Sequence, residues 1–380
     1  MKQGEVCWSG AVDPVASAVS SAEARTRAKT ASLPTRLMTA VCLALALFYC
    51  SIARADETGA SDALFPVQQG GKWGYIDQTG KVVVTPTFAA AALFSEGLGA
   101  VRVGDKWGYV DASGTIVIQP RFDECGSFSD GLVQVHIGDK WAYADRTGKL
   151  AIEGDFSETS DFTEGLAPVG RYKMAGGAPS IELWYIDKQG KRAFAATYSG
   201  LRNFYQGLAA VFVTSGTGEN FKFGAGFIDK TGRMVIPPRF EEVTGFNEGL
   251  ATVSLGGKWG AIDQTGKMII EPRYDAAGQF ADGLAAVQTG GGEAGKWGFM
   301  DRIGTIVIQP QFDSAAGFTE GLAAVKMGGK YGFVDKTGKV VIACQFDDCG
   351  SFGDGLAAVM VGGKIGYIDH TGKYVWEPRE

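Results

Sequence analysis

One motif, Gly-Asp-Lys-Trp-Gly-Tyr-Val-Asp-Ala-Ser-Gly at residues 104–114, returns in versions of itself nine times between residue 64 and residue 380. Aligned on its second aspartate, it recurs at intervals of 34, 34, 42, 42, 34, 38, 34 and 34 residues, at Asp77, Asp111, Asp145, Asp187, Asp229, Asp263, Asp301, Asp335 and Asp369. A fixed period of this size indicates one supersecondary unit stacked on copies of itself. We therefore expect one continuous array over residues 64–380.

Each unit contains three short apolar runs separated by two turn signals. The first signal is Gly-Gly or Gly-Asp, as at 70–71 and 104–105, and these pairs tolerate the positive φ angles of a tight hairpin. The second is Asp-x-x-Gly, in which the carboxylate accepts hydrogen bonds from the turn's own amides and glycine supplies a left-handed residue. The sequence therefore predicts a three-stranded antiparallel meander in every unit.

The middle strand and the loop after the third strand carry the recurring aromatic residues. Because side chains alternate along a strand, Trp107 and Tyr109 should share one face while Gly108 leaves a gap on the other, which we expect a neighbouring aromatic ring to cover. The repeated tryptophans are interpreted as core residues rather than as a ligand platform. Phe122 and Phe128, with their counterparts in the other units, should anchor the loop against the next unit.

These residues resemble the bacterial WG-repeat family, also called KWG repeats, over residues 64–380. Lys-Trp-Gly stands at 72–74, 106–108, 258–260 and 296–298, and units four and five depart furthest from it. The resemblance implies an architecture and no defined catalytic residues. We expect an all-β tandem array of nine three-stranded units that is open or superhelical. The alternative is a closed ring like a β-propeller, whose blades normally have four strands and about 40 residues or more.

The segment before the array has the layout of a secretory signal peptide. A basic flank precedes an apolar core at 37–52, and the small-x-small site Ala-Arg-Ala at 53–55 follows it. We expect residues 1–55 to be a cleaved leader, residues 56–63 a short linker, and the mature protein periplasmic or extracellular, with an uncleaved anchor as the alternative. After cleavage no membrane span is expected.

Charge and cysteine content limit the partners and the covalent chemistry. Cleavage after residue 55 removes six of 36 basic and three of 42 acidic residues, which leaves 30 against 39 and a net charge of −9. Such a protein offers no footprint for nucleic acid. In an oxidising compartment we expect a disulfide between Cys344 and Cys349, with Cys125 left over.

Insertions single out one edge of the array. The distance from the valine of the first strand to the motif aspartate is 10 residues in unit two, 18 in units four and five, and 14 in unit seven. Insertions confined to one loop type should project from one edge, which repeat proteins often use for binding. The alternative is tolerated loop growth. Candidate binding residues in the two longest loops are Arg171, Tyr172, Lys173, Phe221, Lys222 and Phe223, a basic and aromatic set suited to an anionic partner.

No constellation for catalysis, metal or cofactor emerges. The two histidines, His136 and His370, have no Ser or Cys partner by sequence, and one carboxylate per Asp-x-x-Gly turn falls short of the six to eight oxygens that calcium takes. Carboxylate pairs such as Glu241-Glu242 are interpreted as solvated loop charge. We therefore expect no cofactor and a non-catalytic binding or scaffolding protein of the cell envelope, whose partner is a protein or envelope glycan. A glycan-acting enzyme or a purely structural spacer remains the alternative.

Overall fold

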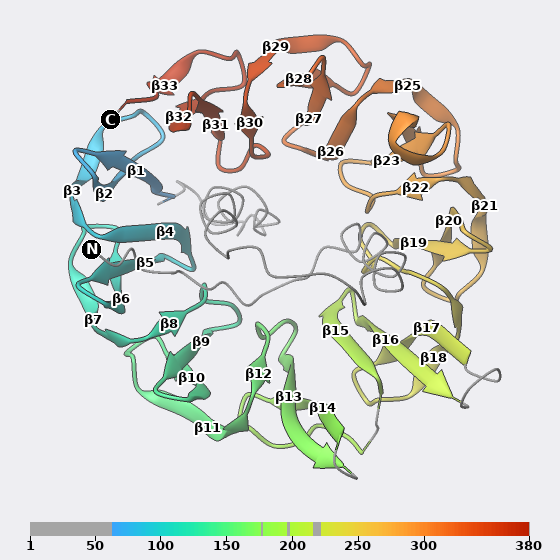
Figure 1. The fold of residues 1–380 in the computed structure, drawn as a ribbon, viewed down its shortest axis with the longest axis horizontal. Coiled ribbons are helices and arrows are strands. Elements are labelled where there is room, and N and C mark those ends of the chain that lie inside the picture. The colour runs from blue at the N-terminus through green and yellow to red at the C-terminus, as the bar shows by residue number, and fades with distance from the viewer. Residues whose placement is uncertain (1–62, 176–177, 196–197, 216–221, 380) are drawn as a thin grey trace, which may run out of the picture.

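A computed structural model describes residues 63–175, 178–195, 198–215 and 222–379 of the chain. Figure 1 shows nine small antiparallel sheets arranged in a closed ring, which we call blades 1 to 9 in chain order. The leader and all but the last residue of the linker lie outside the described residues, so the signal-peptide prediction is not tested. No helix in the described ranges is long and apolar enough to cross a membrane.

Each blade contains two paired strands that the sequence predicts, and a Gly-Gly or Gly-Asp turn joins them in blades 1, 2, 3, 6, 8 and 9. The first of the pair is β1 (Phe65–Gln69), β5 (Leu98–Val103), β9 (Leu132–Ile137), β13 (Leu166–Ala175), β16 (Leu208–Ser215), β19 (Leu250–Leu255), β23 (Leu284–Thr289), β27 (Leu322–Met327) or β31 (Ala357–Val361). The second, which carries the Trp-Gly motif, is β2 (Lys72–Ile76), β6 (Lys106–Asp111), β10 (Lys140–Asp145), β14 (Ala178–Asp187), β17 (Lys222–Asp229), β20 (Lys258–Asp263), β24 (Lys296–Asp301), β28 (Lys330–Asp335) or β32 (Lys364–Ile368).

The predicted third strand forms the outer edge of eight blades. It is β3 (Val82–Phe88), β7 (Ile116–Phe122), β11 (Leu150–Phe156), β18 (Met234–Phe240), β21 (Met268–Tyr274), β25 (Ile306–Phe312), β29 (Val340–Phe346) or β33 (Tyr374–Trp376). Blade 4 has no outer strand among the described residues. Blade 7 adds one short 3-10 helix, η2 (Gly292–Ala294), in its enlarged hairpin.

Seven blades have a further, inner strand beside the centre of the ring. It is β4 (Ala90–Ser95), β8 (Glu124–Cys125), β12 (Glu158–Thr159), β15 (Gly200–Tyr205), β22 (Ala276–Ala277), β26 (Ser314–Thr319) or β30 (Asp348–Cys349). With it, six sheets have four strands and three have three. The inner strand lies in the polar loop after the outer strand and is as short as two residues, which is why the unit reads as three-stranded in the sequence.

The expected open array is wrong, and the closed ring that was its alternative is correct. Closure uses side chains of blades 1 and 9 rather than a shared strand. The hydroxyl of Tyr367 donates to the carbonyl oxygen of Pro66 at 3.0 Å, and its ring meets Phe65 at a centroid distance of 5.4 Å. Trp376 is buried in the same apolar cluster. Tyr75, Tyr109, Tyr143 and Tyr185 make the same kind of hydrogen bond to the next blade, so the seam continues the ring.

Aromatic pairs hold the blades together as expected. Phe128 of blade 3 meets Tyr109 of blade 2 edge-on at 5.0 Å, and the Tyr109 hydroxyl donates to the carbonyl oxygen of Gly126 at 2.8 Å. Equivalent ring pairs at 4.7 to 5.1 Å lie at six of the seven other interfaces from blade 1 to blade 9. Between blades 6 and 7, Ala261 stands at the tyrosine position and shares a cluster with Phe280. Trp107 is buried and the other motif tryptophans pack partly buried against the same clusters, so the core interpretation holds.

The glycine of Trp-Gly is required because the backbone of the outer strand passes close to it. The prediction that an aromatic ring covers this glycine is wrong. The outer strand bulges opposite the glycine, because Trp107 pairs with Phe122 while Tyr109 pairs with Ile118. A Cβ on Gly108 would lie 2.4 Å from the carbonyl oxygen of Ile118 and 2.7 Å from the nitrogen of Pro120. The same approach recurs at Gly74, Gly226, Gly260, Gly298, Gly332 and Gly366. The motif therefore encodes a bulge in the outer strand.

Two kinds of turn on one face of the ring interlock successive blades. A Cβ on Gly148, in an Asp-x-x-Gly turn at φ 84°, would lie 2.7 Å from Ile118 on the outer strand of the preceding blade. The turn after each inner strand holds a non-glycine residue at positive φ, such as Glu96 at 50°. The carboxylate of Glu96 accepts from the amide of Gly131 at 3.1 Å and pairs with Arg146, both in the next blade. Sequence reasoning missed this device.

The cysteines are free thiols in the structure, so the expected Cys344–Cys349 disulfide is not present in it. Cys344 lies on β29 and packs against the cluster between blades 7 and 8. Cys349 is buried in the cluster between blades 8 and 9. The two thiols thus pack against different clusters, although Cys344 is close enough to contribute to the raised pKa of Cys349.

Candidate functional site

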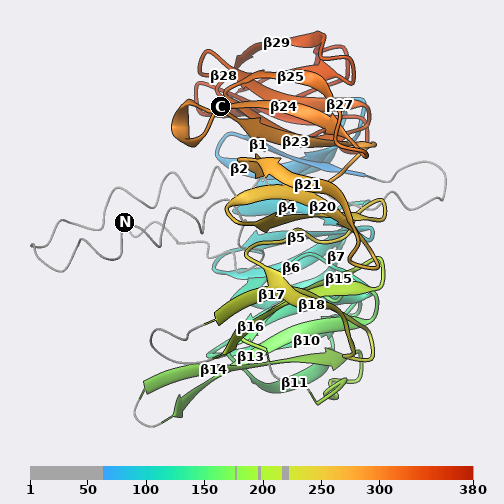
Figure 2. The ribbon, with the colours of Figure 1, turned by 90° about the vertical axis from the view of Figure 1, so that its right-hand side faces the viewer.

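The longest insertions extend hairpins of blades 4 and 5. In blade 4, β13 and β14 pair continuously over ten residues each, from Leu166 with Asp187 to Ala175 with Ala178. In blade 5, β16 and β17 pair from Leu208 with Asp229 to Ser215 with Lys222. Figure 2 shows both hairpins protruding on one side of the ring, the side on which η2 also lies. The insertions are therefore regular strand extensions on one face.

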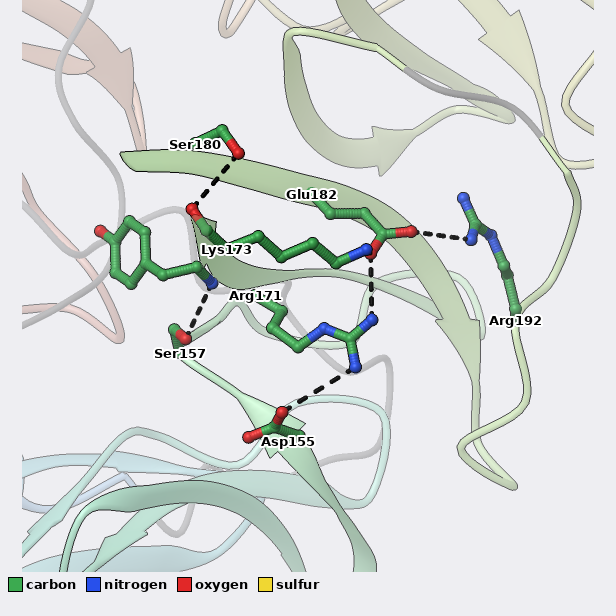
Figure 3. Close-up of polar contacts among 8 residues, drawn as sticks. Asp155, Ser157, Arg171, Lys173, Ser180, Glu182 and Arg192 are labelled. Atoms are coloured by element: carbon green, nitrogen blue, oxygen red, sulfur yellow. Dashed lines mark hydrogen bonds and ion pairs between the residues drawn. The ribbon is translucent and has the colours of Figure 1, made fainter. Parts of the chain in front are cut away.

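Ion pairs organise the protruding half of blade 4 (Figure 3). Glu182 of β14 receives three cations: Arg171 at 3.1 Å, Lys173, and Arg192 at 3.4 Å. Arg171 also lies 3.8 Å from Asp155 of blade 3. Hydrogen bonds from Lys173 and Arg171 lower the pKa of Glu182 to about 2, so it is ionised at neutral pH. We call Asp155, Arg171, Lys173, Glu182 and Arg192 the Glu182 cluster; its formal charge is three positive against two negative.

The exposed aromatic candidates lie on different blades. Tyr172 is 60% exposed, and its hydroxyl is 2.5 Å from a carboxylate oxygen of Glu158, which raises the tyrosine pKa. Phe223 is 51% exposed and stacks on Phe212 at 5.7 Å. Phe212 packs against the cluster between blades 5 and 6, on the far side of blade 5 from blade 4. The structure therefore gives each hairpin its own aromatic surface, with Met174, 73% exposed, beside Tyr172 on β13.

The expected basic patch is only partly present. Arg171 and Lys173 are engaged by Glu182, so they leave a small positive excess rather than a free basic surface. Phe221 lies outside the described residues, and Lys222 is described through its backbone pairing with Ser215 alone. Sequence reasoning missed Glu182, which the hairpin register brings opposite Arg171, and Arg192, which bridges Ile186 and pairs with Glu182.

Trp184 explains why blade 4 lacks an outer strand. It occupies the position of the motif glycine, since it pairs with Val169 as Gly108 pairs with Val101. A bulged outer strand cannot pass over this indole, because even a Cβ collides at the glycine positions. Arg171 and Arg192 lie over the Trp184 ring at 5.8 and 5.9 Å instead. In the described ranges, beyond one bridge from Ile186 to Arg192, no strand pairs with the outer edge of β14.

Groups that could do chemistry elsewhere are tied into the scaffold. Asp123 accepts from Lys106 at 2.5 Å and from the amide of Gly138 in the next blade at 2.9 Å. Glu241 accepts from Gly256 and Gly257 in the same way. The histidines lie in separate blades, His136 against Trp141 and His370 against Phe352. No group of three or more metal-ligating side chains occurs in the described part of the chain.

The repeated bulge over Trp-Gly, with its flanking turns, coincides with a known family pattern. The model of the WG containing repeat matches residues 73–107, 107–141, 141–170, 185–213, 226–259, 259–292, 297–331 and 331–364. The chain belongs to the WG-repeat family. A search of the curated proteins finds no match for this WG-repeat protein.

Solved structures similar to this WG-repeat protein bear on its fold alone. One, described as the crystal structure of the eukaryotic initiation factor, is 14% identical with a TM-score of 0.57, and the match covers 83% of this chain and 95% of that chain. Another is the β-propeller domain of the trilobed protease from Pyrococcus furiosus, 9% identical with a TM-score of 0.39, covering 84% and 99%. The first shares the overall fold of this chain.

Proposed function

We propose that this WG-repeat ring is a non-catalytic binding scaffold of the bacterial cell envelope, and that its partner docks on the protruding hairpins of blades 4 and 5. The observation that carries the proposal is the contrast between one irregular sector and an otherwise uniform ring. Among the described residues the exposed aromatic side chains, Tyr172, Tyr205 and Phe223, all belong to blades 4 and 5, and Met174 on β13 is exposed beside Tyr172. Exposed aromatic and methionine side chains on a rigid support are typical of binding surfaces.

The partner is proposed to be a protein rather than an envelope glycan. Tyr172 and Met174 offer apolar contact, and the Glu182 cluster has only one positive charge in excess. This combination favours a mildly acidic protein surface over a highly charged polymer. Export is proposed from the signal-peptide layout at residues 37–55, and intact-mass measurement of protein from its native host tests it. A mature mass that retains residues 1–55 contradicts export.

The binding proposal is tested by shortening both hairpins to the Gly-Gly form of blade 1 and comparing partner recovery from envelope extract. Surface hairpins contribute little to packing between blades, so the ring should keep its melting temperature while recovery is lost. The matched control shortens the enlarged hairpin of blade 7, around η2, which should leave recovery intact. Equal recovery by both shortened proteins would assign the insertions to tolerated growth and the ring to a structural role.

A further inference from the structure

The outer edge of β14 differs from the corresponding edge of every other blade. In the other eight, the strand that carries the motif pairs with an outer strand on that side. In blade 4 the described residues pair with this edge only near its end, where Ile186 bridges Arg192 and the amide of Ala193 donates to the carbonyl oxygen of Tyr185 at 2.9 Å. An unpaired edge presents amide and carbonyl groups that can pair with another chain.

The hydrogen bond between Ala193 and Tyr185 fixes which residues present these groups. Because the carbonyl of Tyr185 points away from β13, the backbone groups of Leu183 and Ile181 point the same way, as alternate residues of a strand do. Their side chains are half-buried. The backbone of Glu182 and Trp184 is directed toward β13 instead. Beyond the bridge, the edge thus has two residues, Leu183 and Ile181, whose backbone amide and carbonyl groups point outward.

The two sides of this edge differ in chemistry. Glu182 and Trp184 lie on one side with Arg171, whose guanidinium contacts both. Ile181 and Leu183 lie on the other, opposite Tyr172 and Gly170 respectively. A strand added to the edge would therefore place its alternate side chains against a net positive cluster and against an apolar surface.

We infer that the outer edge of β14 binds an extended segment of a partner protein by strand addition, and that this segment alternates acidic and apolar residues. The inference rests on the proposed function and specifies its partner. A second copy of this chain fits less well, because pairing β14 with β14 would bring two net positive Glu182 clusters together. An acidic segment instead supplies a carboxylate to cations that already share Glu182.

The probe is a fluorescein-labelled, capped eight-residue peptide of alternating Asp and Val, titrated against the full-length protein and followed by anisotropy. We expect saturable binding that weakens with added salt, because the charges are partly exposed. The peptide with Lys in place of Asp and the peptide N-methylated at alternate residues should not bind. Hydrogen exchange should show Ile181 and Leu183 amides exchanging rapidly in the free protein and slowly with the peptide, whereas the Trp184 amide is slow in both.

The variant pair Leu183→Pro and Leu183→Ala isolates the backbone contribution. Proline removes one outward donor at an edge, where it is tolerated, and should reduce peptide affinity about 3- to 10-fold more than alanine does. Equal loss in both variants, equal binding of the Lys peptide, or a Leu183 amide already protected in the free protein would overturn the inference. If no peptide binds while hairpin shortening still abolishes partner recovery, strand addition fails and the proposed function stands.

Discussion

The bulge over the Trp-Gly motif predicts that Gly108→Ala destabilises the ring. The added Cβ would lie 2.4 Å from the carbonyl oxygen of Ile118, about 1 Å inside ordinary contact. The obstacle is backbone, so no rotamer change relieves it and β6 and β7 must separate. Overpacking of this kind costs about 1–3 kcal/mol, and we expect the upper part of that range. The measurement is the urea midpoint of unfolding, followed by circular dichroism.

Blade 3 contains the compensation for this clash. Its motif reads Trp-Ala, with Ala142 in place of the glycine, and Gly154 stands where blade 2 has Pro120. There Ala142 pairs with Glu153, a pairing that the other bulges lack. Pro120→Gly alone should lower the free energy of unfolding by about 0.4–1 kcal/mol, because the unfolded chain gains conformational freedom. The double variant should therefore be more stable than Gly108→Ala alone.

A matched control is Gly353→Ala, since a Cβ there would meet nothing within 4 Å and Gly353 is absent from the residues at positive φ. It should leave the midpoint unchanged or raise it slightly. The Gly108→Ala, Pro120→Gly and double variants together form a double-mutant cycle. This cycle measures coupling only if the two single changes act on the same contact. A Gly108→Ala protein as stable as the Gly353→Ala control, or a double variant whose loss equals the sum, would refute the bulge as the reason for the motif.

Three further predictions concern closure, acidity and thiols. Trp376→Ala should lower the free energy of unfolding by about 3–5 kcal/mol, and amide protection should be lost first in β1 and β32. Ile308→Ala, at an interface away from the seam, should reduce amide protection only in the blades that it contacts. Hydrogen exchange distinguishes the two outcomes. The Asp-x-x-Gly carboxylates that have a Ser or Thr two residues later have pKa values lowered by that hydroxyl, to about 2 at Asp229. Their stabilisation is therefore complete above the ordinary pKa near 4 and lost as pH falls toward 2, and the melting temperature should fall over that range. Thiol titration of unfolded, unreduced protein that lacks residues 1–55 should count three free thiols. In the folded protein Cys125, whose pKa burial raises to about 12, should react with iodoacetamide more slowly than Cys344.

Much of the blade could be predicted from sequence because its signals are local. Hairpin and Asp-x-x-Gly turns depend on residues next to one another, and alternation places Trp107 and Tyr109 on one face. The inner strands could not be predicted, because a two-residue strand such as Glu124–Cys125 depends on pairing with β9 and has no periodicity of its own. Closure likewise depends on Tyr367 meeting residues about 300 positions earlier in the chain.

The position of the protruding hairpins could be predicted from the sequence better than the charge balance of their side chains. Insertion lengths located the protruding hairpins, since length is read directly from the repeat. The charge balance could not be read in the same way, because Glu182 meets Arg171 and Lys173 only in the register of the long hairpin. Counting cations in one strand of a hairpin without the opposite strand overstates a basic patch.

The way blade 4 keeps its place in the ring indicates why its edge can be free. In other interfaces the Asp-x-x-Gly turn of the next blade packs against an aliphatic residue of the outer strand, as Gly148 packs against Ile118. Blade 4 has no outer strand, yet the turn of blade 5 is still seated, because a Cβ on Gly232 would lie 2.4 Å from the ring of Phe194. Tyr198 adds a hydrogen bond to the carbonyl oxygen of Gly232 at 3.5 Å. Residues after the β14 turn thus supply the inter-blade contact while pairing with β14 only near its end. Ring closure and strand pairing, which one outer strand provides in the other blades, are separated in blade 4, so the edge can serve binding while the scaffold stays intact.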